Sequence, residues 1–422
     1  MTRARISSIE TLLHPDYPHV VHVLIRTDDG HVGLGESFHH PQAIAEYVHS
    51  VIAPNLIGAS ATNIANAWRL MGNFSDGYQP FSGTITVDSS ATSAVDIALW
   101  DLRSKILGLP LHEALGGAVR DRIRVYNTCA EAGHLPPPDT PAHRRRDYPD
   151  WGIGGPQSSQ YDDWHATLDR PAELARELVD SGITAMKIYP FSPFLPETRG
   201  LYITPQQLDQ GLDVFRAIRS EVGNKIDIAV DMSFSWAYAP ALQIASALDE
   251  FGLIWIEDLT RTASVQAMAG IARVIRTPLA GFDYRVGLAA AIDLVEAGAV
   301  SIVRMDLQWV GGPTEALRIS GYAEARGLGV VLHDCTGPVQ WATAIHCSQR
   351  IPNAMIQESV RAYYNLVYPT MVKRVPQIVD GYAVALDGNG HGAELLGEYT
   401  AGGTTTRSTV RNDQFVTEVV KK

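Results

Sequence analysis

Eight short apolar segments, each followed by a longer stretch with helical periodicity, constrain the fold of this chain more than any other feature. A parallel βα repeat gives this alternation, because each strand needs a helix to return the chain to the same edge of the sheet. Eight closed units form a (β/α)8-type (β7α) barrel, whereas an open doubly wound sheet normally carries a glycine-rich phosphate turn after its first strand. Since that turn is missing, we predict the barrel. The segments are 122–130, 183–189, 226–232, 253–258, 277–283, 300–306, 329–334 and 354–359.

The sequence on either side of this repeat predicts that the chain has three parts: a cap, a barrel and a C-terminal segment. Residues 1–121 read as an α+β capping domain, with a hairpin turn at Asp28–Gly30 and helical periodicity over 41–52 and 89–107. Residues 122–375 are predicted to form the catalytic barrel, and 376–422 a C-terminal segment that packs back on the cap. Between the first two barrel strands, a Pro-, Gly- and polar-rich insertion over 134–165 is long enough that we expect it to be functional or disordered. Within the barrel, helices are expected over 205–222, 240–251, 265–275, 288–297 and 313–326.

Acidic residues recur at the ends of three consecutive predicted strands. Asp231, Glu257 and Asp283 are spaced by one βα unit, 26 residues each time (257 − 231 and 283 − 257). Any one of them could simply cap the following helix. In register they converge at the C-terminal mouth of the barrel, where three carboxylates together require a cation. An all-oxygen ligand set suits Mg²⁺ or Mn²⁺ better than zinc.

The next strands end in a candidate acid–base pair. Asp306 and His333 are 27 residues apart, on neighbouring strands, and an aspartate beside a histidine fixes the tautomer of the imidazole and raises its basicity. A buried histidine satisfied by its neighbour is the structural alternative. Glu358 ends the eighth strand and could donate a proton or a hydrogen bond if burial keeps it protonated.

Lys187 and Tyr189 end the second strand and, two residues apart, face the same side. Lys187 could hold a substrate carboxylate or enolate by charge, or form only a salt bridge at the rim. Tyr189 could donate a proton or a hydrogen bond. It is a poor base unless Lys187 and the metal lower its pKa.

Composition excludes several other classes of protein. The chain has 422 residues, 46 Asp plus Glu against 34 Lys plus Arg, and a net charge of −12, which argues against nucleic acid as a partner. No segment approaches the roughly 20 apolar residues of a membrane span, and Glu10 interrupts the N-terminus before any signal-peptide core. Cys129, Cys335 and Cys347 cannot form a disulfide framework, so we expect a cytoplasmic protein.

These motifs resemble the mandelate racemase-like branch of the enolase superfamily along nearly the whole chain. The segment AVDIALWDLRSKILGLPLHEALGG (94–117) is similar to the helix and loop that join the family's cap to its barrel, and WVGGPTEA (309–316) to its GG-T-EA segment. The resemblance implies that Asp231, Glu257 and Asp283 bind the metal, that His333 and Asp306 form the dyad, and that Glu358 is the late carboxylate.

Three departures from the family pattern bear on the reaction. The K-x-K of the second strand becomes Lys187-Ile188-Tyr189, so the lysine base of a two-base racemase is missing. The third ligand, usually Glu, is Asp283. Ser233 replaces a frequent Asn two residues beyond the first ligand, where we expect a substrate contact. The stretches HDCTGPV (333–339) and QESVRAYY (357–364) resemble an acid-sugar dehydratase subgroup.

The resemblance implies proton abstraction α to a carboxylate, giving an enediolate held by Mg²⁺. Our leading hypothesis is dehydration of a sugar acid, an aldonate or aldarate, to a 2-keto-3-deoxy acid, with His333 as the base. Either His333 or Tyr189 would protonate the β-hydroxyl as it leaves. A racemase, epimerase or cycloisomerase using Tyr189 is the alternative, and a non-catalytic metabolite-binding barrel the minor one. The family's lid loops map to 14–22 and 73–86, which makes Tyr17, His19 and Tyr78 candidate substrate contacts. The family also implies a homo-oligomer.

Overall fold

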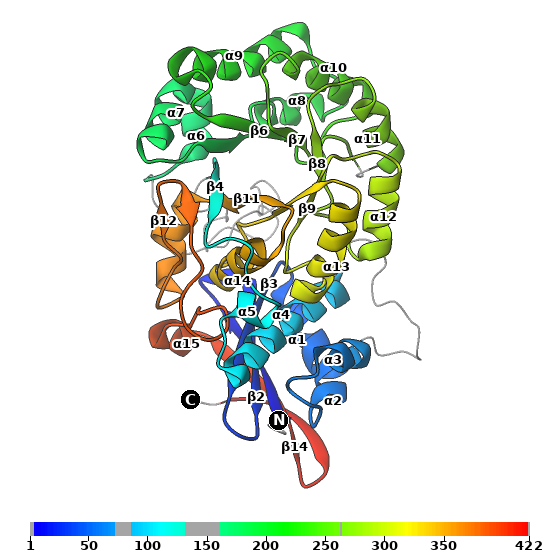
Figure 1. Cartoon of the computed structure of the whole chain (residues 1–422), viewed down its shortest axis with the longest axis vertical. Helices are drawn as coiled ribbons and strands as arrows, with labels where there is room; N and C mark the ends of the chain where they lie inside the picture. Colours follow the sequence, from blue (N-terminus) through cyan, green and yellow to red (C-terminus); the bar gives the residue numbers. More distant parts are fainter. Residues whose placement is uncertain (1–3, 72–85, 131–159, 262–263, 421–422) are drawn as a thin grey trace.

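The predicted barrel is confirmed. A computed structural model describes residues 4–71, 86–130, 160–261 and 264–420, and in it eight parallel strands pair in sequence order and close where β11 pairs with β4 (Figure 1). This closure excludes the open doubly wound sheet. The barrel strands are β4 (Ile123–Thr128), β5 (Ala185–Ile188), β6 (Asp227–Asp231), β7 (Trp255–Glu257), β8 (Leu279–Gly281), β9 (Ile302–Met305), β10 (Gly329–Leu332) and β11 (Ala354–Ser359).

Helices follow the barrel strands close to their predicted bounds. The helix α9 (Pro205–Val222) matches its prediction at both ends, because Thr204 and Gln207 form a capping box and Gly223 ends the helix at positive φ. The end of the predicted insertion is helical rather than loop, since Asp162 caps the helix that begins at Asp163. The other barrel helices are α6 (Asp163–Asp169), α7 (Pro171–Asp180), α8 (Leu195–Thr198), α10 (Tyr238–Leu248), α11 (Val265–Ala272), α12 (Leu288–Glu296), α13 (Gly312–Ala325) and α14 (Pro338–Arg350).

The N-terminal part forms a separate antiparallel sheet with the strand order β15-β14-β1-β2-β3. Its β3 lies directly on the helix α4, because a side chain at Gly33 or Gly35 would meet the backbone oxygens of Ala98 and Ala94 at 2.1 and 1.9 Å. The cap comprises β1 (Ile6–His14), β2 (Tyr17–Thr27), β3 (Val32–Phe38), α1 (Pro41–Tyr47), the π-helix η1 (Val48–Ile52), α2 (Ala53–Leu56), α3 (Ile64–Met71), α4 (Val87–Leu107) and α5 (Leu111–Ala114).

The C-terminal residues contribute to both sheets. The short strands β12 (Ile378–Val379) and β13 (Tyr382–Ala383) extend the barrel sheet beside β4. The strands β14 (Thr404–Arg411) and β15 (Gln414–Val419) extend the cap sheet, where β14 pairs antiparallel with β1. Both chain ends therefore lie at the cap end of the molecule (Figure 1). The domain bounds 1–121, 122–375 and 376–422 stay predictions. The remaining elements are η3 (Ser192–Phe194), η5 (Tyr363–Val367), η6 (Tyr368–Thr370) and α15 (Gly397–Gly402).

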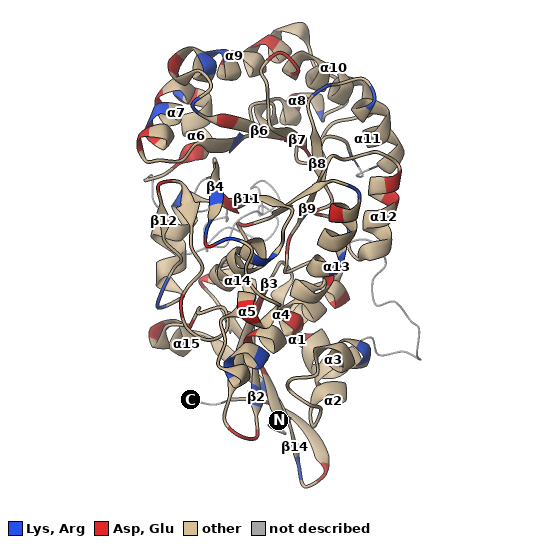
Figure 2. Ribbon diagram, viewed as in Figure 1, with Lys and Arg blue, Asp and Glu red and all other residues tan. Residues whose placement is uncertain are grey.

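Acidic and basic residues are interspersed over the outer helices (Figure 2). No helix in the described part of the chain is both long enough and apolar enough to cross a bilayer.

One buried histidine joins the two ends of the chain within the cap. His49 Nε2 lies 2.8 Å from Thr11 Oγ1 of β1, and its Nδ1 lies 2.8 Å from Ser408 Oγ of β14. Burial lowers the pKa of His49 to about 4. An unfolded histidine, with a pKa of about 6.5, binds a proton at a higher pH than the folded one. Folding stability is therefore complete above pH ~6.5 and falls as the pH drops toward 4.

Between pH 7 and pH 4.5, we expect the free energy of unfolding to fall less in His49→Gln than in the wild type. The two pH slopes should differ by at most about 1.4 kcal/mol per pH unit. Urea unfolding at several pH values measures this difference. Parallel stability curves for the two proteins would contradict it.

Candidate functional site

The barrel interior carries an ordered layer of side chains below its C-terminal mouth. One buried residue comes from each strand: Tyr126, Ala185, Ala229, Trp255, Ala280, Ile302, Val331 and Ile356. Because side chains alternate along a strand, residues two positions further along point inward one layer nearer the mouth. That register brings together Lys187, Asp231, Glu257, Arg304, His333 and Glu358.

Lys187 lies among three of the predicted carboxylates. Its Nζ donates to Glu257 Oε1 at 2.7 Å, and it lies 2.8 Å from Glu358 Oε1 and 3.6 Å from Asp231 Oδ2. The lysine side chain is 1% exposed. The ammonium group of Lys187 therefore lies inside the barrel, and this position excludes an exposed salt bridge at the rim.

Arg304 is a second buried cation that our sequence interpretation missed. Its guanidinium lies 3.0 Å from Glu257 Oε1 and 2.5 Å from Glu358 Oε2, and it also donates to Asp283 Oδ2. The signal was present, because Arg304 precedes Asp306 by two residues and therefore faces the same side of β9.

The two cations decide the protonation of Glu358. Burial alone would raise the pKa of this carboxyl, but Arg304, Lys187 and His333 lower it well below its usual range. The ionised form of Glu358 is thus favoured, so burial does not supply the protonated carboxyl on which the suggested donor role depends. Burial likewise opposes the charge on Lys187, yet Glu257 and Glu358 keep the pKa of the ammonium well above its usual value despite the nearby Arg304.

The predicted dyad is formed. His333 Nδ1 lies 2.5 Å from Asp306 Oδ2. A carboxylate accepts hydrogen bonds, so this contact assigns a proton to Nδ1 and directs Nε2 away from Asp306. That nitrogen lies 3.8 Å from Glu358 Oε2 and 3.2 Å from Cys335 Sγ, the second residue that sequence interpretation missed. The Gln308 backbone N–H and the Thr336 hydroxyl also donate to Asp306, at 2.6 and 3.1 Å.

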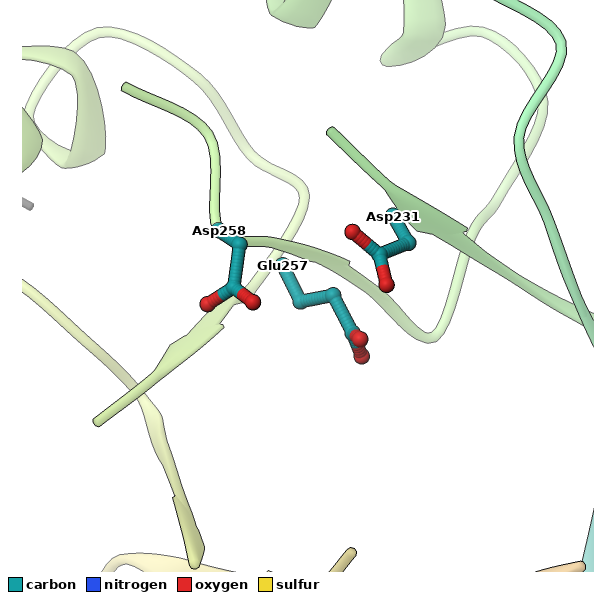
Figure 3. A group of neighbouring side chains, drawn as sticks. All are labelled: Asp231, Glu257 and Asp258. Carbon is teal, nitrogen blue, oxygen red and sulfur yellow. The ribbon is translucent and has the colours of Figure 1, made fainter. Parts of the chain in front are cut away.

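Three carboxylates from two neighbouring strand ends approach closely enough to share a cation. Asp231, Glu257 and Asp258 each offer an oxygen within 4.8 Å of the others, and Figure 3 shows these side chains extending to the same side of β6 and β7. Period-two alternation would turn Asp258 away from Glu257, but a positive φ of 52° at Asp258 changes its direction. This backbone turn cannot be read from the sequence.

The carboxylate cluster fits a divalent cation on two grounds. Asp258 Oδ1 and Asp283 Oδ1 are both buried and have no hydrogen-bond partner among the residues that the structure describes, a costly arrangement for carboxylate oxygens without a cation. In addition, burial together with the charges of Asp231 and Glu257 raises the pKa of Asp258 well above its ordinary value. The carboxylates of the cluster thus carry more negative charge than Lys187 and Arg304 balance.

Asp283 occupies a different position from the other predicted ligands. It follows β8 by two residues and breaks the period-two register, with a φ of 122° at Phe282 just before it. One of its oxygens accepts from Arg304, and the other is the unpartnered Oδ1. Among the described residues the close cluster therefore contains Asp258 rather than Asp283.

An aromatic group lies beside the base. The Trp309 ring is 5.3 Å from the His333 ring, 5.7 Å from Tyr284 and 6.0 Å from His39, and Tyr284 is 5.0 Å from Phe234. The Trp309 indole nitrogen is buried and has no hydrogen-bond partner within the described part of the chain. Sequence interpretation missed this group, because its members come from four different loops.

The other predicted site residues differ in their surroundings. Tyr189 is 5.9 Å from Lys187 Nζ, and burial raises the pKa of its phenol well above the usual value despite Lys187. The raised pKa disfavours the phenolate, the form that Tyr189 would need to act as a base. Ser233 donates to Asp231 Oδ1 from both its backbone N–H and its hydroxyl, at 2.7 and 3.2 Å. It thus orients a carboxylate.

The predicted cap contacts are only partly described. Tyr17 is buried, with its hydroxyl 2.5 Å from Thr370 Oγ1. The His19 ring lies 6.1 Å from the His39 ring, next to the aromatic group. Tyr78 lies outside the described residues. Substrate contact by these three residues stays a prediction.

A capped barrel with its charged groups at the C-terminal strand ends defines an enzyme of the enolase class. A family model described as enolase C-terminal domain-like matches residues 170–399, and the mandelate racemase / muconate lactonizing enzyme N-terminal domain model matches residues 12–116. The chain belongs to the enolase superfamily, in its mandelate racemase-like branch.

Individual relatives agree with this assignment. A D-galactonate dehydratase of Verminephrobacter eiseniae is 27% identical over 367 residues, covering 86% of this chain and 83% of that protein. The crystal structure of an enolase of the mandelate racemase subgroup from Agrobacterium tumefaciens is 33% identical, covers 98% of both chains and has a TM-score of 0.81. An enolase protein from Sargasso Sea environmental sequencing is 32% identical, covering 97% of this chain and 100% of that one, with a TM-score of 0.82.

We expect Arg304→Gln to lower the free energy of unfolding by about 3–5 kcal/mol at neutral pH, because it leaves buried carboxylates uncompensated. Chemical denaturation measures the loss. Arg216→Gln is the matched control: its guanidinium is 45% exposed and pairs with Asp209 and Asp213 on the surface, so the substitution should leave stability nearly unchanged. Equal effects of the two substitutions would contradict the structural role of Arg304.

Proposed function

We propose that the protein is a Mg²⁺-dependent dehydratase of a sugar acid, an aldonate or aldarate, and forms a 2-keto-3-deoxy acid. The His333–Asp306 pair carries this proposal, because an imidazole whose Nδ1 is held by a carboxylate presents its Nε2 as a general base. The relatives named D-galactonate dehydratase support loss of water from an acid sugar.

His333 would remove the proton α to the substrate carboxylate. The resulting imidazolium lies against Asp306 on one side and 3.8 Å from the ionised Glu358 on the other, so two negative charges stabilise it. His333 then holds a proton next to the departing β-hydroxyl and can deliver it, so that water leaves. Lys187 adds a fixed positive charge, 2.8 Å from the opposite oxygen of Glu358.

Asp231 and Glu257, with Asp283 as the predicted third ligand, would hold the metal ion, and Asp258 adds charge beside them. When bound, Mg²⁺ or Mn²⁺ supplies Lewis-acid stabilisation of the negative charge that develops on the substrate. Ser233 keeps Asp231 oriented toward this position. Asp283 has the free oxygen that a ligand needs.

Isomerisation by the same enolisation is the second candidate. It needs a group on the opposite face to return the proton, and Tyr189, whose raised pKa keeps it protonated, is the residue available for that step. A phenol that stays protonated cannot remove the α-proton of the other enantiomer, which disfavours a two-way racemase.

Several properties complete the proposal. The cap residues Tyr17, His19 and Tyr78 are proposed to contact the distal part of the substrate. A cytoplasmic location agrees with three cysteines that are all unpaired and buried. We also propose a homo-oligomer, as the family resemblance implies, and no nucleic-acid or membrane partner.

Incubation with a library of aldonic and aldaric acids and Mg²⁺ should give a semicarbazide-reactive 2-keto product from at least one acid. His333→Asn should lower kcat by about 10²–10⁴-fold through loss of the base. His31→Asn, in the cap hairpin, is the control and should leave kcat unchanged. Turnover that survives His333→Asn would refute the assigned base. In D₂O, deuterium in recovered acid without loss of water would indicate an isomerase instead.

Calorimetric Mn²⁺ titration tests the proposed ligands without any substrate. We expect Asp231→Asn, Glu257→Gln and Asp283→Asn each to weaken Mn²⁺ binding by at least about tenfold, since each removes a charged ligand. Asp249→Asn, which removes a carboxylate that caps backbone N–H groups elsewhere, should bind Mn²⁺ normally. If Asp258→Asn weakens binding while Asp283→Asn does not, Asp258 is the third ligand.

A further inference from the structure

A carboxylate of the cap is buried at the junction with the barrel. Glu36, on β3, is completely buried. Its Oε1 accepts from the Gln308 side-chain amide at 2.8 Å and from the Gln340 backbone N–H at 3.1 Å. Its Oε2 accepts from the Val339 backbone N–H at 3.4 Å and lies 3.0 Å from His22 Nε2. Apart from His22, these partners all belong to the barrel domain.

The two glutamines that bind Glu36 also bind the dyad. The Gln308 backbone N–H donates to Asp306 Oδ1 at 2.6 Å, and its side-chain amide also donates to the Thr336 carbonyl at 3.3 Å. The Gln340 side-chain amide donates to the His333 carbonyl at 2.5 Å. One hydrogen-bonded path therefore leads from Glu36 to Asp306, and another leads from Glu36 to His333.

The surroundings leave Glu36 little freedom to move. It meets the N-terminus of α14, where free backbone N–H groups and the helix dipole favour a carboxylate. A side chain at Gly337 would come within 1.9 Å of Glu36 Oε1, and the φ of 154° there also disfavours other residues. The neighbouring Ser37 hydroxyl donates to the Gln308 carbonyl at 3.2 Å. Residues of the cap and residues of the barrel thus both restrict the position of Glu36.

We infer that Glu36 is a positioning residue for the general base, which makes the cap part of the catalytic apparatus. The inference rests on the proposed function of His333. Through Gln308 and Gln340, the Glu36 carboxylate sets the distance and angle between Asp306 and His333. A displacement of about 1 Å in such a pair can reduce the rate of the chemical step about 10²-fold. The contacts that dock the cap on the barrel therefore also orient the base.

Two substitutions distinguish the effect of the length of the Glu36 side chain from the effect of its charge. Glu36→Asp keeps the charge but withdraws the acceptor by one methylene, away from both glutamines. Glu36→Gln keeps the length and one acceptor oxygen, which can still receive Gln308 and Gln340. We expect kcat to fall about 10- to 100-fold in Glu36→Asp and only a few-fold in Glu36→Gln, with KM nearly unchanged in both.

Glu10 provides the matched control. It is a buried carboxylate on β1 of the same sheet, but its partners Arg26 and Arg407 belong to the cap sheet and not to the barrel. Glu10→Asp should lower the melting temperature without changing kcat. If Glu36→Asp and Glu10→Asp lower stability alike and both leave kcat unchanged, the role of Glu36 is only structural and the inference is overturned.

A measurement without substrate separates this inference from the proposed function. The proton between His333 Nδ1 and Asp306 should give a far-downfield ¹H NMR resonance, assigned by its loss in His333→Asn. We expect Glu36→Asp to shift or broaden it, with Glu36→Gln close to wild type and Glu10→Asp identical to it. A shift without any dehydratase activity would refute the function and keep the positioning role. An unchanged resonance in Glu36→Asp would refute the positioning role.

Should Glu36→Asp fail to fold, Gln340→Leu carries the same test, since it removes the amide that donates to the His333 carbonyl. It should also shift the resonance and lower kcat. A Gln340→Leu protein with a wild-type resonance and kcat would equally overturn the inference.

Discussion

The balance of charge inside the barrel is the constraint on which the rest of the site depends. Five carboxylates (Asp231, Glu257, Asp258, Asp283 and Glu358) surround two buried cations, Lys187 and Arg304. Isolated charges are very costly in such an interior, so every acid needs a cation, a proton or a metal ion. This excess of negative charge suits a divalent cation and, in the proposed reaction, a His333 that takes up a proton.

The second requirement is a fixed geometry around His333. The barrel supplies Asp306 through the register of its strands, but the residues that hold the pair, Gln308 and Gln340, are themselves bound by the cap through Glu36. The two domains thus contribute at different levels. In the proposed mechanism, the strand ends supply the reactive groups and the contact between cap and barrel positions them.

Much of this arrangement could be predicted from the sequence, because it depends on regular periods. The spacing of strand-end residues along βα units identified Asp231, Glu257, Asp306, His333 and Glu358, which the structure brings into one network with Lys187. What could not be predicted depends on irregular backbone or on long-range contact. A positive φ redirects Asp258, cations reverse the expected protonation of Glu358, and Glu36 meets Gln308 across 272 residues of sequence.

The pairing of β14 with β1 has a consequence for how the protein is made. The first strand of the chain finds one of its two neighbours only in residues 404–411, near the other end. During synthesis the barrel strands emerge in order, whereas the cap sheet stays incomplete until residues 404–411 have been made. Pairing across nearly the full length of the chain is intrinsically slow. The edge of β1 opposite β2 therefore has no strand partner from this sheet until after all the barrel strands have been made.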